Sequence, residues 1–303
     1  MVHGTHNAVQ DDRNNNIKIY VNGEFLNRND AKISVFDSGY LVGDGVWEAV
    51  RLLKGTLIFL DDHFSRLWYA AKATGIKLPY SKLELKSIVE KVLETNNMQD
   101  GVHVRIMVTR GIKKTPSQDP RLTISGPNLV IIPEYKTADP SSKNMGIKLF
   151  TSTIRRGSPD YLDPKLNCHS KLHEVQALIQ AIEAGADEAL MLDVNGFVST
   201  CNSTNFFIIK NGIVYTSTGQ YCMNGITRQK IIDVCISNNI EVRETNFSLF
   251  DVYSADEAFV TGTFAGVTPV VSVDGKSIEN NSKNEFSATL EKYYKSLALS
   301  QVK

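Results

Sequence analysis

Residues 17–26 read IKIYVNGEFL, and this stretch predicts how the fold begins. Apolar residues alternate on both sides of Asn22-Gly23, a pair that favours the two positive φ angles of a tight hairpin turn. Asn-Gly and Asp-Gly turns recur along the chain, as at Asn195-Gly196 and Asn211-Gly212. Because such turns join antiparallel strands, they argue against a doubly wound parallel sheet. We therefore expect an α/β (α+β) protein whose sheets are mixed and largely antiparallel.

Helical patterns occur between the predicted strands. The stretch DDHFSRLWYAAKATG (61–75) predicts a helix that is capped by Asp61 or Asp62 and closed by Gly75. Further helices are expected over 81–96, 169–184, 227–238 and 284–297. Strands are expected in a second hairpin over 46–60 and at 103–111, 128–135, 146–152, 187–193, 204–210, 213–217, 240–245, 257–261 and 268–273.

The length of 303 residues suits two domains. Residues 136–145, KTADPSSKNM, lose all periodicity and contain Pro and Ser, as a connection between domains does. We expect a small N-terminal α/β domain over 17–135 and a larger C-terminal domain over 146–303. Residues 1–16 are polar and unpatterned, and we interpret them as a flexible tail.

The composition favours a small-molecule function. Lysine plus arginine and aspartate plus glutamate both number 33, so no overall charge would attract nucleic acid or an acidic membrane. No N-terminal apolar stretch has the length of a signal peptide or a membrane span. The four cysteines form no CxxC pair, which favours reduced thiols and a cytoplasmic location. They are Cys168, Cys201, Cys222 and Cys235.

Two stretches could bind an anion through the backbone. NGITRQKIIDVC (224–235) places Gly225, Ile226 and Thr227 at a helix start, where free N–H groups and the positive end of the dipole can hold a phosphate. FVTGTFAGVTPV (259–270) ends a strand with Thr261-Gly262-Thr263, which offers hydroxyls and a close backbone approach. An ordinary helix cap and an ordinary strand-to-turn transition explain the same residues.

Several arginines could add to such a site. Arg66 lies on a helix face, where it is either a solvated charge or an anion ligand. Since no GxGxxG or Walker sequence is present, one phosphate is favoured over a nucleotide. Arg105 and Arg110 lie within the apolar strand HVRIMVTRG and must either form core ion pairs or bind a substrate carboxylate. SGYLVGDGVWEAVR (38–51) packs three glycines around Asp44, as a tight turn does.

DPKLNCHSKLH (163–173) concentrates reactive groups at the start of an apolar helix. His169 and His173 are four residues apart and would share a helix face, as metal ligands can. No acidic residue or cysteine at matching spacing completes the set, so we predict no metal site. The spacing of the apolar residues predicts a helix packed on the core. These residues are Leu172, Val175, Leu178, Ile179 and Ile182.

Taken in order, these stretches resemble the class IV aminotransferases, the fold type IV pyridoxal-phosphate family that includes branched-chain and D-amino acid aminotransferases and aminodeoxychorismate lyase. The resemblance runs from Ile17 to about Tyr293. It implies two α/β domains with a pyridoxal 5′-phosphate between them, and a homodimer in which a loop of one subunit reaches the partner's site. The markers are GYLVGDGVWEAVR, DDHFSRL, HVRIMVTRG, GADEALMLDVNGFV, STNFFIIKNG, NGITR and DEAFVTGTFAGVTPV.

The resemblance also implies residue roles. Tyr40 and Arg105 match residues near the substrate carboxylate in branched-chain enzymes. Trp47 matches an aromatic residue on the substrate side, although a core tryptophan explains it equally well. The residues that match the cofactor site are Arg66, Gly225, Ile226, Thr227, Gly262 and Thr263 around the phosphate and Thr200 and Asn205 near the ring.

Three positions depart from the family pattern. Related chains read like DPxxKSLNYL, and this alignment places Asn167 at the position of the lysine that attaches the cofactor. Lys171 stands at the position of the tyrosine beside the cofactor's phenolic oxygen. Thr200 stands at the position of the glutamate that pairs with the pyridine nitrogen. Asparagine cannot attach the cofactor or shuttle a proton, and threonine offers only a neutral hydrogen bond.

Three hypotheses follow. In the first, Lys171, one helical turn past Asn167, replaces the missing lysine, and Lys165 is the weaker candidate. In the second, a lysine-free enzyme catalyses an altered reaction, or uses another small phosphate or carboxylate ligand, with His169, Lys171 or Cys168 as acid or base. In the third, the chain is a non-catalytic descendant that binds a ligand or partner. The expected substrates are amino acids and 2-oxo acids of the branched-chain type, with L-amino acids preferred.

Overall fold

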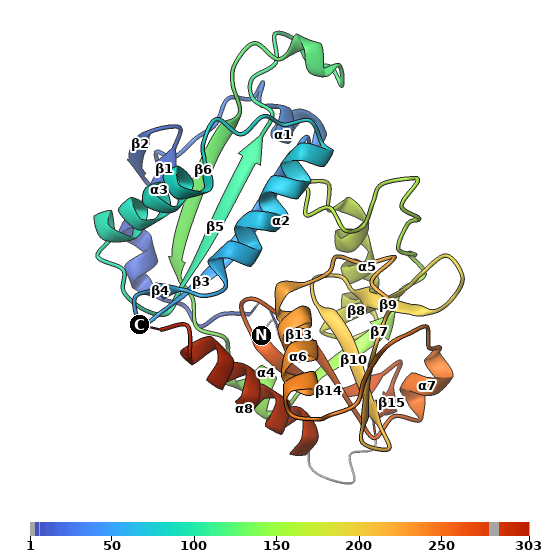
Figure 1. The fold of residues 1–303 in the computed structure, drawn as a ribbon. Helices are drawn as coiled ribbons and strands as arrows, with labels where there is room; N and C mark the ends of the chain where they lie inside the picture. The colour runs from blue at the N-terminus through green and yellow to red at the C-terminus, as the bar shows by residue number, and fades with distance from the viewer. Residues whose placement is uncertain (1–3, 6, 279–284, 303) are drawn as a thin grey trace. The chain divides into compact units, whose positions relative to one another are not determined.

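The computed structural model describes residues 4–5, 7–278 and 285–302, and Figure 1 shows the chain as a ribbon. The chain divides into two compact units. Unit 1 comprises 1–9, 138–166 and 172–300, and unit 2 comprises 10–137, 167–171 and 301–303. The boundary between Thr137 and Ala138 falls within the stretch 136–145, and residues 167–171 return to unit 2 in the middle of the C-terminal half.

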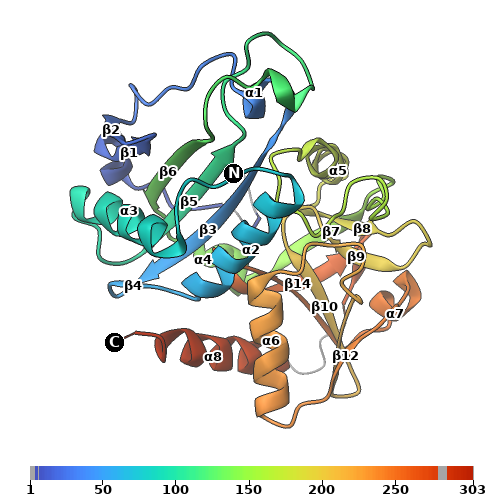
Figure 2. The same ribbon diagram turned by 45° about the horizontal axis from the view of Figure 1, so that its top comes forward.

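Unit 2 is built on a six-stranded sheet with the order β2-β1-β6-β5-β3-β4, whose central strands are visible in Figure 2. All of its strand pairs are antiparallel. The strands are β1 (Lys18–Val21), β2 (Glu24–Asn27), β3 (Gly45–Leu53), β4 (Thr56–Leu57), β5 (Val102–Thr109) and β6 (Asn128–Tyr135). The helical elements are η1 (Asp12–Asn16), α1 (Ser38–Val42), α2 (Leu60–Ala73), α3 (Lys82–Thr95) and η2 (Pro120–Leu122).

Turn chemistry explains both hairpins of this sheet. Asn22 and Gly23, with φ of 50° and 105°, connect β1 to β2, which confirms the predicted turn. Lys54 and Gly55, with φ of 46° and 78°, connect β3 to β4. The local sequence therefore determines where this sheet reverses direction.

Helices α2 and α3 cover one face of the unit 2 sheet, where α2 contacts β3 and α3 contacts β1 and β6. Alternate residues of β3 point into this core, so Val46, Glu48 and Val50 have no exposed surface. Trp47 and Ala49, which alternate with them, lie on the opposite face, where Trp47 is half-buried and Ala49 is 7% exposed. The predicted aspartate cap of α2 is wrong, because the N-cap is Phe59 in the left-handed region. Both aspartates lie instead in the first turn, where the helix dipole favours negative charge.

Part of the predicted flexible tail packs on unit 2. The side-chain amide of Asn14 donates to the Tyr135 carbonyl and accepts from its N–H, both at 2.8 Å. The Arg13 guanidinium lies 3.5 Å from the centroid of the Tyr135 ring. These contacts attach η1 to β6, so residues 12–16 have a defined structure that composition alone did not suggest.

Unit 1 contains a nine-stranded sheet with the order β12-β11-β10-β13-β14-β7-β8-β9, and β15 pairs with β14. The pairs β11–β12, β14–β7 and β7–β8 are parallel, and the others are antiparallel, as expected for a mixed sheet. The strands are β7 (Ile147–Thr151), β8 (Glu188–Leu192), β9 (Val198–Cys201), β10 (Asn205–Lys210), β11 (Ile213–Thr216), β12 (Val242–Glu244), β13 (Glu257–Gly262), β14 (Gly266–Val273) and β15 (Lys276–Ser277).

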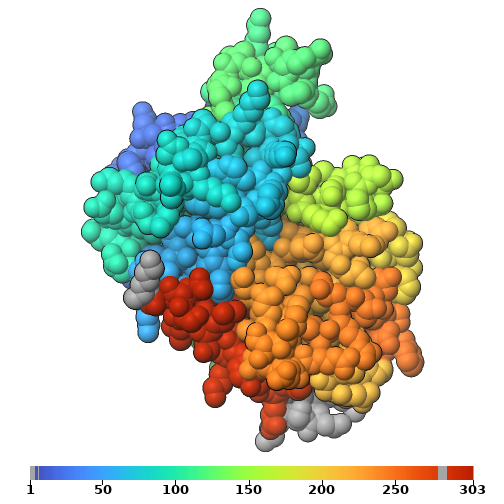
Figure 3. Space-filling view, in the orientation of Figure 1, coloured from blue at the N-terminus to red at the C-terminus, as the bar shows by residue number. Residues whose placement is uncertain are grey.

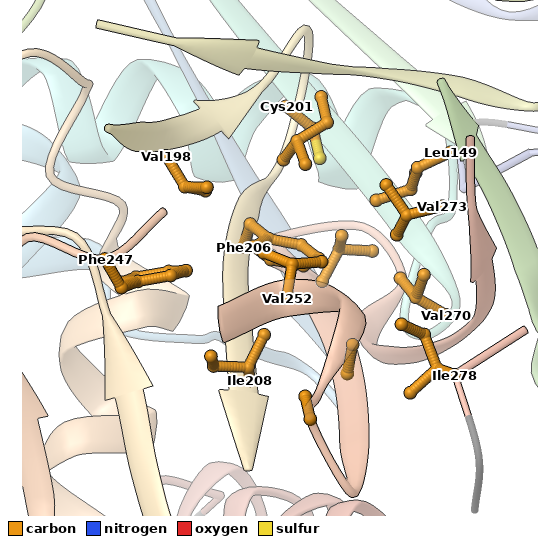
Figure 4. Packing of buried hydrophobic residues seen from close by; sticks show 14 of the residues in the cluster. Leu149, Val198, Cys201, Phe206, Ile208, Phe247, Val252, Val270, Val273 and Ile278 are labelled. Atoms are coloured by element: carbon orange, nitrogen blue, oxygen red, sulfur yellow. The ribbon is translucent and has the colours of Figure 1, made fainter. Parts of the chain in front are cut away.

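Helices flank this sheet. They are α4 (Pro140–Asn144), α5 (Leu172–Glu183), α6 (Ile226–Ser237), α7 (Leu249–Tyr253) and α8 (Glu285–Leu299). Helices α6 and α8 lie side by side, as the space-filling view in Figure 3 shows, and cover a cluster that includes the stacked rings of Phe207 and Phe259. A second cluster includes Phe206, Phe247 and Val252, and Figure 4 shows their side chains pointing toward one another. No helix within the described ranges is long and apolar enough to cross a membrane.

Helix α5 packs differently from the prediction. Its buried face consists of Glu174, Ala177 and Ala181, and the alanines pack on Ala189 and Met191 of β8. Small side chains allow the helix to approach the strand closely, so the large apolar side chains point away from it. The predicted core stripe is therefore exposed at four of its five positions, namely Leu172 (70%), Val175 (51%), Ile179 (48%) and Ile182 (61%).

Candidate functional site

The start of α6 in unit 1 has the geometry of an anion site. Its N-cap is Gly225, with φ −63° and ψ 139°, and this cap makes no side-chain hydrogen bond. Ile226 and Thr227 follow and are 9% and 4% exposed. The N–H groups of this turn and the positive end of a 12-residue helix can therefore act on a bound anion.

Two neighbouring strands bring polar side chains to the same place. Asn205 on β10 and Thr261 on β13 are direct cross-strand neighbours. A Cβ at Gly225 would overlap Asn205 Oδ1, so any larger residue at the helix start would have to displace this amide. Thr261 is 2% exposed, and its hydroxyl has no hydrogen-bond partner in the described residues. The structure thus brings together Gly225, Asn205 and a buried hydroxyl that can still donate a hydrogen bond.

The turn between β13 and β14 and the strand β9 supply the other predicted residues of this unit. Gly262 is the last residue of β13 and pairs with Gly266, and Thr263 is half-buried in the turn between them. Thr200 is buried, and its hydroxyl donates to the Thr204 carbonyl at 2.7 Å while accepting from Asn205 Nδ2 at 3.4 Å. Because its proton is already used, the Thr200 oxygen can act only as a neutral acceptor.

Residues 167–169 form a short extended segment on the edge of β3 in unit 2. The Trp47 N–H donates to the Asn167 carbonyl at 3.0 Å, and the His169 N–H donates to the Gly45 carbonyl at 2.9 Å. Cys168 between them forms an antiparallel bridge with β3. The prediction that a helix begins at residue 169 is wrong, because these backbone groups pair with β3 and α5 begins only at Leu172.

This correction changes two expectations. His169 is not helical, so it does not share a helix face with His173. Lys171 is half-buried and precedes α5, so it does not lie one helical turn past Asn167. Within the part of the chain that the structure describes, no group of three or more His, Cys, Asp or Glu side chains is arranged to hold a metal ion.

The three glycines of SGYLVGDGVWEAVR make room for this segment. A Cβ at Gly39 or Gly45 would lie 3.1 or 2.9 Å from His169 Nδ1, and one at Gly43 would lie 2.6 Å from Ser170 Oγ. Gly43 also has φ of 70°, which glycine adopts without strain. The glycines therefore serve close packing against His169 and Ser170 in addition to a tight turn.

Asn167 and His169 each leave a buried polar atom without a partner. Asn167 is 2% exposed, and its Nδ2 donates to the Trp47 carbonyl at 2.8 Å, but its Oδ1 has no hydrogen bond within the described residues. The same is true of His169 Nε2. Burial lowers the pKa of His169, although the nearby Asp37 carboxylate opposes this shift. The imidazole is therefore neutral at pH 7.

The two arginines of β5 and its end behave differently. Arg110 forms a two-pronged ion pair with Asp44, at 2.6 and 2.9 Å, so it fits the ion-pair interpretation. The Arg105 guanidinium stacks 4.3 Å above the centroid of the Trp47 ring. No hydrogen bond or ion pair of Arg105 is found among the described residues. Burial lowers its pKa, partly opposed by Glu134, and a guanidinium of this kind stays charged.

Arg66 projects from α2 toward β3. Its Nε and Nη2 donate to the two carboxylate oxygens of Glu48 at 2.6 and 2.9 Å, and His63 Nδ1 lies 2.8 Å from Glu48 Oε2. Burial raises the pKa of Glu48, but the charge of Arg66 and the hydrogen bond of His63 outweigh it, so the net shift is downward. Tyr40 on α1 is 71% exposed.

Comparison with known proteins identifies the family. The sequence profile of the amino-transferase class IV family matches residues 45–273. The chain belongs to the class IV aminotransferase family. The matched range includes the β3 strand, the segment 167–171 and the start of α6, so it contains most of the site residues above, whereas Tyr40 and Asp44 precede it.

Relatives in this family carry two kinds of name. The chain is 37% identical over 278 residues to the branched-chain-amino-acid aminotransferase-like protein 1 of Arabidopsis thaliana, a match that spans 92% of this chain and 50% of that protein. This chain thus spans about half the length of the Arabidopsis relatives it matches. It is 32% identical to a D-alanine aminotransferase of Listeria monocytogenes, over 92% of this chain and 95% of that one.

A solved class IV structure has the same fold. A branched-chain amino acid aminotransferase from a T.th. strain, solved with pyridoxamine 5′-phosphate, superposes with a TM-score of 0.87 and 25% identity, covering 93% of this chain and 94% of that one. This likeness confirms the expected fold class, a two-sheet α/β architecture of fold type IV.

Two residues of this class IV chain were missed by the sequence analysis. Glu48 and His63 fix the guanidinium of Arg66, and both are at most 1% exposed. The alternation Val46-Glu48-Val50 in the sequence indicates a buried ion pair, because it places a carboxylate on the apolar face of a strand. Such a charge must be paired, and a basic partner from the covering helix was therefore required.

Proposed function

We propose that this chain is an aminotransferase-like enzyme that uses pyridoxal 5′-phosphate and acts on amino acids and 2-oxo acids of the branched-chain type. The observation that carries the proposal is the uncapped start of α6 beside the buried, unpaired hydroxyl of Thr261. A phosphate fits this arrangement because it accepts hydrogen bonds from backbone N–H groups and from a hydroxyl. Pyridoxamine 5′-phosphate in the solved branched-chain relative supports the same cofactor here.

The residues present fit the phosphate better than the ring. Ile226, Thr227, Thr261 and Thr263 would hold the phosphate, and the role of Arg66 as a further phosphate ligand stays a prediction. When bound, the cofactor supplies a ring that draws electrons from a reacting amine. Thr200, at the family's glutamate position, is neutral and has no proton to donate. We therefore infer that this chain stabilises a protonated ring nitrogen less than a carboxylate would.

We infer that the site is non-standard because Asn167 stands at the position of the family lysine. An asparagine amide neither attaches the cofactor nor moves protons, so another group must do the proton transfer. His169 is the best candidate, since its neutral imidazole keeps Nε2 unpaired in the buried segment. The role of Lys171 as a relocated lysine stays a prediction, and the extended segment gives it less support than a helix would.

For the substrate, Arg105 is the proposed carboxylate ligand. Its guanidinium lies on the face of the unit 2 sheet that no helix of that unit covers, among the described residues, and Trp47 fixes its plane. An unpaired guanidinium and a flat aromatic ring suit the carboxylate and the apolar chain of an α-amino acid. Tyr40 stays a predicted neighbour of the same carboxylate.

We also propose that the chain forms a homodimer through α5. The exposed apolar residues Leu172, Val175, Ile179 and Ile182 form a continuous helix face, which water solvates poorly. A second copy could cover this face with its own apolar residues across a two-fold axis. Light scattering should find a dimer for the unaltered chain and a monomer for Ile179→Asp. Gln176→Asp, on the same helix, is the control that should stay dimeric.

The expected cytoplasmic location stays a proposal. All four cysteines are free and buried, which is usual for proteins of reducing compartments.

Transfer of an isotope-labelled amino group tests the function. The full chain is incubated with pyridoxal 5′-phosphate, ¹⁵N-labelled L-leucine and 2-oxoglutarate, and mass spectrometry detects labelled glutamate. We expect transfer that is lost in His169→Phe and retained in Lys171→Ala. Loss in Lys171→Ala with retention in His169→Phe would favour the relocated lysine. Bound cofactor without transfer, for this pair and for D-alanine with pyruvate, would favour a different reaction or the non-catalytic alternative.

A further inference from the structure

Unit 2 contains three groups whose hydrogen-bonding capacity is unused among the described residues: Asn167 Oδ1, His169 Nε2 and the Arg105 guanidinium. We propose that Asn167 Oδ1 and His169 Nε2 bind the ammonium group of a free α-amino acid whose carboxylate binds Arg105. The inference deepens the proposed function and rests on it for the role of Arg105. In this proposal the segment 167–171, which lacks the family lysine, binds the amino group of the ligand through hydrogen bonds and not through a covalent bond.

The orientation of the Asn167 amide is fixed. Its Nδ2 donates to the Trp47 carbonyl at 2.8 Å, so flipping the amide would place oxygen against oxygen. The Oδ1 atom is thereby left as a buried acceptor without a donor in the described part of the chain. Such an atom destabilises a fold, and a ligand that brings a donor removes the penalty.

The tautomer of His169 makes it a second acceptor. A hydrogen bond to the Val46 backbone opposes the lowering of the His169 pKa, and because Nε2 has no partner among the described residues, Nδ1 is the ring nitrogen that faces this backbone. An Nδ1–H that donates to a carbonyl leaves the lone pair on Nε2. Packing of Nδ1 against Gly39 and Gly45 holds the ring in this position.

These groups lie on one face of the unit 2 sheet. In an extended segment the side chains of Asn167 and His169 point to the same side, roughly 6.6 Å apart along the chain. The pairing with β3 places Asn167 beside Trp47, and Trp47 lies on the same face as Arg105. The charge of Arg105 is close enough to help lower the pKa of His169.

The chemistry of the free groups defines the ligand. Two acceptors without a donor require a group with at least two N–H bonds, and a primary ammonium has three. A guanidinium that makes no hydrogen bond among the described residues can bind a carboxylate. An α-amino acid carries both at adjacent positions, whereas a 2-oxo acid or a simple carboxylic acid lacks the ammonium.

The arrangement also predicts a pH dependence. The charged groups that face His169 are Asp37, Asp44 and Arg105, and their net effect together with burial is a lowered pKa. When the pH falls through this value, below the ordinary 6.5, the ring gains a proton and loses its acceptor. The affinity for the ammonium group should then fall, while the affinity for a simple carboxylic acid should not.

Calorimetric titration of the full chain without cofactor tests the proposal. The matched probes are L-leucine with 4-methylpentanoate and D-alanine with propionate, which differ only in the amino group. We expect at least one amino acid to bind about 10 to 100-fold more tightly than its acid, the range for two charge-assisted hydrogen bonds. Asn167→Leu and His169→Phe should each abolish this advantage and leave the affinity for the acid unchanged. Arg105→Gln should weaken both ligands.

Two further variants guard against misfolding. Asn167→Asp can keep the bond to the Trp47 carbonyl only as a protonated carboxyl, whose other oxygen still accepts, so it should retain the advantage of the amino acid, whereas Met107→Leu on the same face should change neither affinity. Equal affinities for amino acid and acid, no binding of either amino acid, or an advantage that survives Asn167→Leu would overturn the proposal. Inorganic phosphate is titrated separately. If phosphate binds but the amino acid binds no more tightly than its acid, the ammonium site is refuted and the cofactor proposal is not. The reverse result refutes the cofactor proposal alone.

Discussion

The start of α6 keeps the residues that are typical of the family, whereas the segment 167–171 has replaced them. At α6, Gly225 caps the helix without a side-chain bond, and the sequence GIT of the family is present. In the segment, Asn167 and Lys171 replace the residues that the resemblance leads one to expect. The first region binds through backbone groups, and the second acts through side chains.

This difference explains why one region can change while the other is retained. A backbone N–H at a helix start is present whichever side chains follow, provided that glycine leaves room beside Asn205. The chemistry of the segment depends on one atom at one position, so a single substitution alters it. Retained phosphate residues therefore support a phosphate ligand without specifying the reaction.

The largest effect is expected when the family lysine is restored in the segment 167–171. In Asn167→Lys the amine would lie at a position that is 2% exposed, and burial lowers the pKa of a lysine toward the neutral form that attacks a carbonyl. We expect borohydride to fix pyridoxal phosphate covalently and stoichiometrically to this variant and not to the unaltered chain. Intact-mass measurement and peptide mapping check both.

Asn167→Met, which has similar length and no amine, is the matched control. Labelling of the unaltered chain at Lys171 would contradict the lysine-free interpretation and revive the relocated lysine. An unlabelled Asn167→Lys that still binds the cofactor would show that position 167 does not face the aldehyde.

The second largest effect concerns Arg66. The position of its guanidinium depends on the side chain of Glu48, just as the chemistry of the segment 167–171 depends on side chains. Glu48→Gln removes the buried charge that pairs with Arg66 and His63, and we expect a loss of about 3 kcal/mol in the free energy of unfolding. Glu90→Gln, which breaks an exposed pair with Lys86, should cost less than about 1 kcal/mol. Urea unfolding of both variants gives the comparison, and equal losses would contradict it.

The pH dependence of the Glu48 effect has a defined sign. The folded-state pKa of Glu48 lies below its ordinary value of 4.5. Its stabilisation is therefore fully present above pH 4.5 and is lost as the pH falls through the lower folded value. The difference in stability between the unaltered chain and Glu48→Gln should shrink over this acid range and stay constant at neutral pH.

Features that depend on neighbouring residues could be predicted from the sequence. The Asn22-Gly23 turn follows from the φ angles that these residues allow. The start of α5 could not be predicted, because it depends on Asn167 pairing with Trp47, which is 120 residues away. The buried face of α5 was also missed, since its large apolar stripe competes with an alanine face and periodicity does not say which one meets β8.

The same division applies to the site. The helix start at Gly225 could be recognised from local sequence, as could the hydroxyls of Thr261 and Thr263. Which hydroxyl stays unpaired depends on the register that sets Thr261 opposite Asn205, and a single sequence does not give strand register. The orphaned atoms of Asn167 and His169 likewise follow from a tertiary pairing.

A smaller effect tests whether the phosphate site depends on backbone access. The φ of Gly225 is −63°, which alanine also adopts, so Gly225→Ala acts only through the overlap with Asn205. We expect a loss of about 2 kcal/mol in stability, as for overpacking, together with weaker phosphate binding. Gly126→Ala, where a Cβ would meet nothing within 4 Å, is the control. Thermal unfolding with and without phosphate checks both, and equal shifts for the two variants would contradict the role of Gly225.

The smallest effect is expected for Thr261→Val, which should lower the affinity for phosphate without lowering the stability of the fold. Thr261→Val replaces a buried hydroxyl that has no partner among the described residues with a methyl group of the same shape. Without ligand, we expect the variant to be as stable as the unaltered chain or up to about 1 kcal/mol more stable, because no unpaired donor is buried. With phosphate or the cofactor, we expect affinity to fall about tenfold, since one hydrogen bond is missing.

Thr268→Val, which also removes a buried hydroxyl without a partner among the described residues, should share the stability effect but not the loss of affinity. If both variants bound phosphate equally well, the hydroxyl of Thr261 would have no part in the anion site, and only the backbone of α6 would remain to define it.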